Sequence, residues 1–207
     1  MQQAAPGILA VVFDFGNVLA MFDHLAQCRQ LARRSPLSAE EILRRIWNND
    51  LERDAESGRY GSQEQFQRIR RRIQAPESWT YEQFLQDFAA GLEFNPEGLA
   101  ALRLAAGAGR RTFILSNISY AHARCLFLHE ELATIPEGYV LSFKVRAMKP
   151  DSAIWRHLLR TTGLAAEQCL YIDDEAPFCE AAQAQGFTAL HYRRGSTDLL
   201  GRLRDLW

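Results

Sequence analysis

The sequence predicts an α/β protein with a parallel sheet, interrupted by an inserted block of helices. Three short apolar runs are typical of buried strands, and a fourth is weaker: residues 8–13, 111–116, 169–173 and 187–192. Helical segments separate these runs, and this alternation indicates βαβ units. A long stretch without a convincing strand, residues 21–91, follows the first run.

The stretch 21–91 is expected to be helical throughout. Asn95-Pro96 is typical of an N-cap followed by the first residue of a helix, so the sheet-containing part resumes near residue 92. We therefore expect a core made of residues 1–20 and 92–207, with residues 21–91 as a helical insert able to close over the strand ends. Three pairs have capping-box spacing, which marks helix starts: Ser38 with Glu41, Ser62 with Gln65, and Thr80 with Gln83.

Composition excludes several classes of protein. The 207 residues are 47% hydrophobic, which is enough for one sizeable core. The formal net charge is −1, so no general basic field attracts nucleic acid, and we interpret the basic run 68–74 as a solvated helix face. No run approaches the roughly 18 apolar residues of a membrane span. The four cysteines form no CxxC pair, which favours reduced thiols and therefore a cytoplasmic protein. From the charge and the short apolar runs we expect neither nucleic acid nor a membrane as a partner.

Polar side chains stand where the predicted strands end. Asp14 follows the first strand, Ser116 ends the second, and Asp173 ends the third. The carboxyl ends of parallel strands share one edge of a sheet, and ligands bind at that edge. These three residues are therefore expected to be neighbours, although they lie far apart in the sequence.

Four local motifs follow one another along the chain: Asp14-Phe15-Gly16-Asn17, Leu115-Ser116-Asn117, Lys149 within MKPD, and the pair Asp173-Asp174. Each alone has an ordinary interpretation as a turn, a helix cap or an exposed charge. However, the chain has only two lysines, Lys144 and Lys149, so a lysine in a motif carries information. Adjacent carboxylates also repel each other unless a cation lies between them. The motifs together favour a cation-binding site.

In this order the motifs resemble those of the haloacid dehalogenase-like hydrolases. They are most similar to a branch of small sugar-phosphate phosphatases, which includes bacterial glucose-1-phosphate phosphatases, and to the N-terminal phosphatase domain of epoxide hydrolases. The resemblance spans most of the chain. It implies a Rossmann-like core of three layers around a parallel sheet, with the helical insert corresponding to the family's C1-type cap.

The resemblance also implies a reaction and a cofactor. Asp14, ionised at the ordinary pKa of a carboxyl group, would attack phosphorus and form an aspartyl-phosphate that water later hydrolyses. Mg²⁺ would be held by Asp14, by the backbone carbonyl of Gly16 and by Asp174, with Asp173 acting through a water molecule.

Further residues would bind the substrate. Lys149 would orient Asp14 and the phosphoryl oxygens, while Ser116 and the backbone N–H groups near Asn117 would donate hydrogen bonds to those oxygens. Asn17 is a further candidate beside the nucleophile. His122 matches a histidine of the sugar-phosphate branch, and the alternative is an ordinary histidine on a helix surface.

Gly16 is a departure from the family pattern. Most phosphatases of the family carry an aspartate at this position, which protonates the leaving alcohol and later activates water; such help contributes roughly 10²–10⁴ in rate. His24, or Asn17 with a water, could substitute. The substrate could instead have a leaving group that needs little protonation, such as an anomeric, aryl or acyl phosphate, or the protein could be a weak enzyme. We favour the second of these three interpretations.

The sequence thus predicts a Mg²⁺-dependent phosphatase acting on a small phosphorylated metabolite, with a sugar phosphate as one candidate. Three other functions stay open: a metal-independent haloacid-type dehalogenase, a weakly active or non-catalytic binding protein, and a phosphotransferase or phosphomutase. The expected partner is the phosphorylated small molecule, and a homodimer is also left open.

Overall fold

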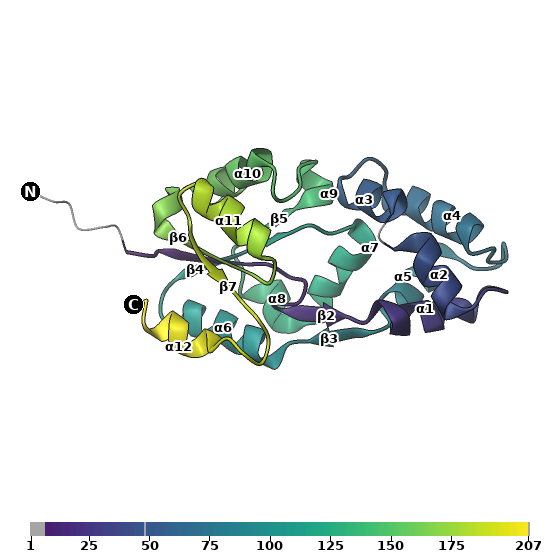
Figure 1. The fold of residues 1–207 in the computed structure, drawn as a ribbon, viewed down its shortest axis with the longest axis horizontal. Helices are drawn as coiled ribbons and strands as arrows, with labels where there is room; N and C mark the ends of the chain where they lie inside the picture. Colours follow the sequence, from purple (N-terminus) through teal and green to yellow (C-terminus); the bar gives the residue numbers. More distant parts are fainter. Residues whose placement is uncertain (1–6, 48, 207) are drawn as a thin grey trace, which may run out of the picture.

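The computed structural model describes residues 7–47 and 49–206, and its core is a five-stranded parallel sheet (Figure 1). The strand order is β5-β4-β1-β6-β7. Four of the five strands match the apolar runs predicted from the sequence. The strands are β1 (Ala10–Phe13), β4 (Arg111–Ser116), β5 (Gly138–Leu141), β6 (Cys169–Asp173) and β7 (Thr188–His191).

Strand β1 lies at the centre of the sheet because it is apolar on both faces. All four of its residues are buried, as expected for a parallel strand covered on both sides. Its last residue, Phe13, is in register with Ile114 of β4 and Ile172 of β6. This register brings the residues that follow each strand to one edge of the sheet, as the sequence predicted.

Two helical layers cover the sheet, so the predicted three-layer architecture is confirmed. Alternate residues of β1 point to opposite faces. Val11 and Phe13 pack in the cluster that contains residues of α6 and α12, whereas Ala10 and Val12 pack in the cluster that contains residues of α10 and α11. These two pairs of helices lie on opposite sides of the sheet (Figure 1). The bounds are α6 (Pro96–Gly107), α12 (Leu199–Arg204), α10 (Ser152–Thr162) and α11 (Ala176–Ala184).

Five helices form the helical insert, which lies beyond the carboxyl ends of the central strands (Figure 1). They bury their own apolar cluster, with Ile42, Trp79 and Phe84 at its centre. Its assignment to the C1 type and the exact domain boundaries stay predictions. The helices are α1 (His24–Ala32), α2 (Ala39–Ile46), α3 (Asp50–Glu56), α4 (Ser62–Arg72) and α5 (Tyr81–Phe88).

A short antiparallel ribbon joins the insert to the core. Strand β2 (Ala20–Phe22) pairs with β3 (Leu92–Phe94) where the chain leaves and re-enters the core. The expectation that residues 21–91 contain no strand is therefore wrong at its first two residues. These strands have only three residues each, too few for an alternating pattern to be recognised.

The sequence analysis also missed one strand of the sheet and misplaced one helix cap. Strand β5 was not predicted because it is short, lies at the sheet edge and begins with two half-buried residues. The capping boxes at Ser38 and Thr80 are confirmed. By contrast, Ser62 is the first residue of α4 rather than its cap; Gly61 is the N-cap, and the Ser62 hydroxyl lies 2.5 Å from that of Tyr81.

The remaining elements are short. All four cysteines are buried thiols outside any disulfide. Among the described residues, none of the helices is both long enough and apolar enough to span a bilayer. The short segments are α7 (Tyr120–Ala123), η1 (Arg124–Leu128), α8 (Glu130–Thr134), α9 (Ser142–Val145) and η2 (Ala166–Gln168).

Asn95 stabilises the core through both ends of its side-chain amide. Its Oδ1 accepts a hydrogen bond from the N–H of Glu97 at 3.3 Å, which confirms the predicted N-cap of α6. Its Nδ2 donates to the carbonyl of Val18 at 2.8 Å and to the Tyr192 hydroxyl at 3.0 Å. Asn95 therefore fixes the segment after β1, which carries Asp14, against the start of α6.

We expect Asn95→Ala to lower the free energy of unfolding by about 2 kcal/mol, because a helix cap and two buried hydrogen bonds are lost together. Urea denaturation measures the change. Asn95→Asp is the matched variant, since it keeps the cap acceptor but places a carboxylate against two oxygen atoms. It should be at least as destabilising, and an Asn95→Asp protein as stable as the wild type would contradict this account.

Candidate active site

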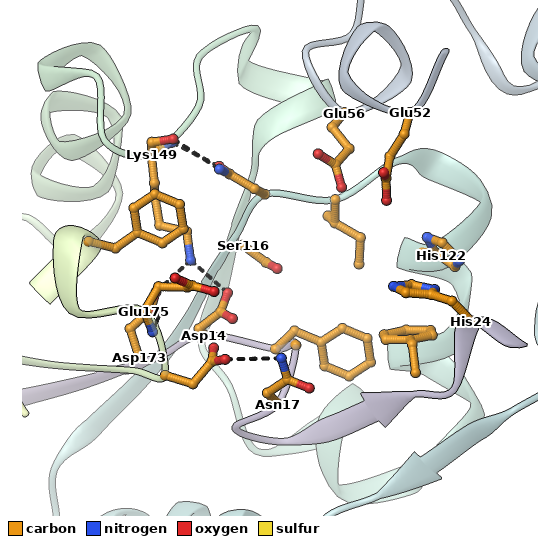
Figure 2. Close-up of a pocket in the computed structure, with 17 residues that line it drawn as sticks. Asp14, Asn17, His24, Glu52, Glu56, Ser116, His122, Lys149, Asp173 and Glu175 are labelled. Carbon is orange, nitrogen blue, oxygen red and sulfur yellow. Dashed lines mark hydrogen bonds and ion pairs between the residues drawn. The ribbon is translucent and has the colours of Figure 1, made fainter. Parts of the chain in front are cut away.

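A pocket lies between the carboxyl edge of the sheet and the helical insert (Figure 2). The pocket is lined by all nine residues that the sequence analysis proposed: Asp14, Gly16, Asn17, Ser116, Asn117, His122, Lys149, Asp173 and Asp174. Their individual roles stay predictions. The parallel register explains the convergence, because three of the four motifs follow neighbouring strands. The insert adds side chains that the sequence analysis did not propose, above all Glu52 and Glu56.

Lys149 lies between two buried carboxylates. Its Nζ donates to Asp14 Oδ1 at 2.8 Å and to Asp173 Oδ2 at 2.6 Å (Figure 2). Burial alone would lower the pKa of Lys149, but the two ion pairs outweigh it and raise that pKa above its ordinary value. The lysine is therefore a permanent cation at the base of the pocket.

Asp14 is only 6% exposed, and burial is the main reason that its pKa rises to about 7. Lys149 opposes this shift, while the charge of Asp173 adds to it. Burial therefore makes Asp14 harder to ionise than the ordinary carboxyl group assumed from the sequence. A second cation would restore the charged form, since a nearby opposite charge lowers a carboxyl pKa.

Three carboxylates meet at the end of the central strand. One oxygen each from Asp14, Asp173 and Asp174 can lie within 4.8 Å of the others. Asp173 is further oriented by the N–H of Glu175, 2.8 Å from its Oδ1, and by the hydroxyl of Tyr171. A set of carboxylate oxygens suits a hard divalent cation such as Mg²⁺, so the residues present fit the predicted cofactor.

The charges in the pocket also favour a bound cation. Burial raises the pKa of Asp174, against a hydrogen bond that Asn17 Nδ2 donates to its Oδ2 at 2.9 Å. Glu52, Glu56 and Glu175 add further acidic groups to the pocket, and Lys149 is the sole lysine or arginine among the described residues that line it. A phosphate dianion would be repelled by this surplus of negative charge unless a cation were bound.

The turn after β1 places Asn17 rather than Gly16 in a strained conformation. Asn17 has a φ of 54°, in the left-handed region that asparagine tolerates. A Cβ added to Gly16 would meet only Asp14 Oδ2, at 3.7 Å, which is ordinary contact. The fold therefore does not require glycine at this position. The Gly16 carbonyl accepts the N–H of Val18 at 2.6 Å and retains a second lone pair for a ligand.

Asn117 holds Lys149 in place through the backbone. Its Nδ2 donates to the carbonyl of Lys149 at 3.0 Å, and its Oδ1 accepts the N–H of Lys149 at 2.8 Å. The side-chain amide of Asn117 is thus occupied, which leaves backbone groups and the neighbouring Ser116 hydroxyl as donors to a phosphoryl group. The sequence analysis did not foresee this positioning contact.

The two histidines of the pocket are neutral. His122 is buried against the rings of Phe88 and Phe22, with centroids 4.5 Å and 4.7 Å away, and burial lowers its pKa to about 3. His24 stacks on Trp47 at 4.0 Å, and burial is again the main cause of its lowered pKa. His122 is therefore not on a helix surface. Neither histidine is well suited to donate a proton as an imidazolium at neutral pH.

Glu52 and Glu56 point into the pocket from α3 (Figure 2). They are four residues apart and therefore share one helix face. Burial, followed by the charge of Glu52, raises the pKa of Glu56 to about 8. The spacing is visible in the sequence, but nothing there indicates that this face points toward Asp14.

The comparisons with known proteins agree with this geometry. The sequence profile of the haloacid dehalogenase-like hydrolases matches residues 8–186. The chain belongs to this family, and it is an enzyme, a hydrolase. It is 29% identical over 203 residues to Phosphatase MT3486 of Mycobacterium tuberculosis (strain CDC 1551 / Oshkosh), covering 96% of this chain and 94% of that relative.

Solved structures share the fold. A HAD family enzyme from Bacteroides thetaiotaomicron, bt-2542, superposes with a TM-score of 0.81 at 20% identity, covering 96% of this chain and 99% of that one. A crystal structure of that enzyme contains magnesium and inorganic phosphate. The L-2-haloacid dehalogenase of Xanthobacter autotrophicus superposes with a TM-score of 0.67 at 20% identity, over 94% of this chain and 81% of that one. At these identities the likeness concerns the fold alone.

We expect Lys149→Met to lower the free energy of unfolding by about 3–5 kcal/mol at neutral pH, because it leaves two buried carboxyl groups without their cation. The pKa of Asp14 should then rise further above its unfolded value. The native state would bind more protons than the unfolded state, so the variant loses stability as pH rises.

Urea denaturation in metal-free buffer, at about pH 5 and about pH 8, tests this sign, and the deficit should be larger at the higher pH. Lys144→Met, which changes the chain's other, exposed lysine, is the matched control and should have little effect at either pH. A deficit that is equal at both values would contradict the assigned role of Lys149.

Proposed function

We propose that the protein is a Mg²⁺-dependent phosphatase that acts on a small phosphorylated metabolite, with Asp14 as the nucleophile. The observation that carries the proposal is the convergence of Asp14, Asp173 and Asp174 beside Lys149 in one pocket. The curated phosphatase relative and the magnesium and phosphate complex of a structural neighbour support it.

Asp14 is placed to attack a phosphoryl group entering the pocket. Lys149 holds its Oδ1, which orients the carboxylate, and the same ammonium group attracts the phosphoryl oxygens. An oxygen of Asp14 bonds to phosphorus while the bond from phosphorus to the leaving oxygen breaks. Ser116 and the backbone after it are positioned to donate hydrogen bonds to the phosphoryl oxygens. Water then attacks the phosphorus and regenerates the carboxylate.

Mg²⁺ would neutralise the charge of the phosphate and of the clustered carboxylates. Asp14, Asp174 and the Gly16 carbonyl are the groups we assign to hold it, with Asp173 acting indirectly through a water molecule. The hydrogen bond from Asn17 fixes one oxygen of Asp174, and Lys149 together with Tyr171 fixes Asp173. These contacts would hold the donor oxygens in place before the cation arrives, which reduces the cost of binding.

The side of the pocket that faces the acidic cluster suits a polar leaving group. Glu52, Glu56, His24 and His122 line it, so carboxyl groups and neutral imidazoles face the space beyond the phosphoryl group. Such groups accept and donate hydrogen bonds to hydroxyl groups. The lining is therefore compatible with a sugar phosphate, which is the substrate class we favour.

A dehalogenase is the second candidate because a haloacid dehalogenase shares the fold. That chemistry also uses an aspartate nucleophile but needs no metal. The acidic cluster disfavours it, since three carboxylates at one point serve no purpose without a cation.

We expect a panel of phosphorylated metabolites to reveal turnover that requires Mg²⁺ and stops on addition of EDTA. Asp14→Asn should reduce kcat/KM by at least about 10³-fold, because the nucleophile is removed without a large change in shape. Asp151→Asn, an exposed aspartate in the MKPD motif, is the matched control and should keep most of the activity. EDTA-resistant release of halide from a 2-haloacid would instead support the dehalogenase.

A further inference from the structure

The phosphoryl end of the pocket has no evident proton donor for the leaving group. Asp14 and Asp173 are paired with Lys149, and Asp174 accepts a hydrogen bond from Asn17. Gly16 supplies no side chain where most family phosphatases have an aspartate. Apart from Glu175, the remaining carboxyl groups among the described residues of the pocket lining are Glu52 and Glu56 of the insert.

We propose that Glu56, at the end of α3, is the general acid and base of the reaction and takes the place of the aspartate missing at Gly16. This inference rests on the proposed phosphatase function. Its basis is position: Glu56 points from the insert into the same pocket as Asp14 and Lys149 (Figure 2). We assign the leaving group to this side of the pocket.

The backbone of Glu56 is fixed to the core. Its carbonyl accepts a hydrogen bond from the Ser142 hydroxyl at 2.7 Å, and that hydroxyl accepts the N–H of Ile118 at 2.9 Å. Ile118 directly follows the Ser116-Asn117 motif. The end of α3 is thereby tied to the segment that is expected to bind the phosphoryl oxygens.

A glycine allows this close approach. Gly58 has a φ of 69°, and a Cβ at this position would lie 2.1 Å from the backbone oxygen of Phe143. The turn after α3 therefore packs directly on the backbone that follows β5. These two contacts fix the end of α3 and the turn after it against the core, and general acid catalysis requires such a fixed position.

The protonation state of Glu56 suits the role. Its pKa of about 8, raised mainly by burial and then by Glu52, keeps it protonated at neutral pH and able to lose the proton during turnover. Lys149 lowers this pKa and Asp14 raises it, which indicates that both charges act on the Glu56 carboxyl group. The titratable and charged groups that share the pocket with it are Asp14, His24, Glu52, His122, Lys149, Asp173, Asp174 and Glu175.

The proton balance closes over the two steps. As Asp14 bonds to phosphorus and the bond to the leaving oxygen breaks, the Glu56 carboxyl group transfers its proton to that oxygen and the alcohol departs. Glu56, now a carboxylate, then takes a proton from the water that attacks phosphorus. The bond from Asp14 to phosphorus breaks, inorganic phosphate is released, and both side chains return to their starting states.

This assignment differs from the interpretation favoured on sequence grounds, in which an easily displaced leaving group makes an acid unnecessary. The two accounts predict opposite behaviour. With Glu56 as the acid, the wild-type rate depends only weakly on the pKa of the leaving group. Without an acid, the rate falls steeply as that pKa rises.

The test is a series of aryl phosphates, from dinitrophenyl phosphate to unsubstituted phenyl phosphate, assayed with Mg²⁺ on the wild type, Glu56→Gln and Glu52→Gln. We expect Glu56→Gln to lower kcat/KM for phenyl phosphate by about 10²-fold or more, but by less than about tenfold for dinitrophenyl phosphate. Glu52→Gln makes the same change of a carboxyl group to an amide one helical turn away, and it should change the rates on all substrates by a similar factor.

Two results would overturn the assignment of Glu56. One is that Glu56→Gln lowers kcat/KM by the same factor for all substrates. The other is that the wild-type rate already falls steeply as the pKa of the leaving group rises. If the proposed phosphatase function itself were wrong, the wild type would show no Mg²⁺-dependent turnover of any phosphate ester, so the two failures can be distinguished. Equal melting temperatures of the two glutamine variants exclude misfolding as the cause of a selective loss.

Discussion

The ion pair of Lys149 with Asp14 and Asp173 is the interaction on which the site depends. Two carboxylates at the ends of neighbouring buried strands would repel each other, and the sheet could not bring them together without a cation between them. Lys149 supplies that charge from a loop that Asn117 holds by two hydrogen bonds. The same arrangement leaves the pocket acidic beyond Asp14, which is the basis of the proposal that a second, divalent cation binds there.

The pocket divides the chemistry between two parts of the chain. The sheet edge supplies Asp14, Lys149 and the acidic cluster, to which we assign the phosphoryl group. The helical insert supplies Glu52, Glu56 and His24, to which we assign the leaving group. The bond from Ser142 to the Glu56 carbonyl fixes these two parts relative to each other. This connection is the basis for our proposal that Glu56 of the insert replaces the aspartate missing at Gly16.

The strand ends and the core of the site were predictable because short apolar runs and the residues that follow them are local signals. Strands β2 and β3 were missed since three residues carry too little pattern, and β5 was missed because its first two residues are only half-buried. The substrate role predicted for Asn117, through nearby backbone N–H groups, stays a prediction, but the hold of its side chain on Lys149 was not foreseen. Glu56 was not proposed at all. Both cases depend on how distant segments pack, because the orientation of the helical insert over the sheet leaves no periodic mark in a single sequence.

The central claim is that Asp14 itself accepts the phosphoryl group. Rapid acid quenching during turnover, followed by mass spectrometry of the peptides, tests it most directly. The account predicts one added phosphoryl group on the peptide that contains Asp14, present with Mg²⁺ and absent in Asp14→Asn. Sustained phosphate release with no phosphorylated Asp14, or with the label on another residue, would contradict it.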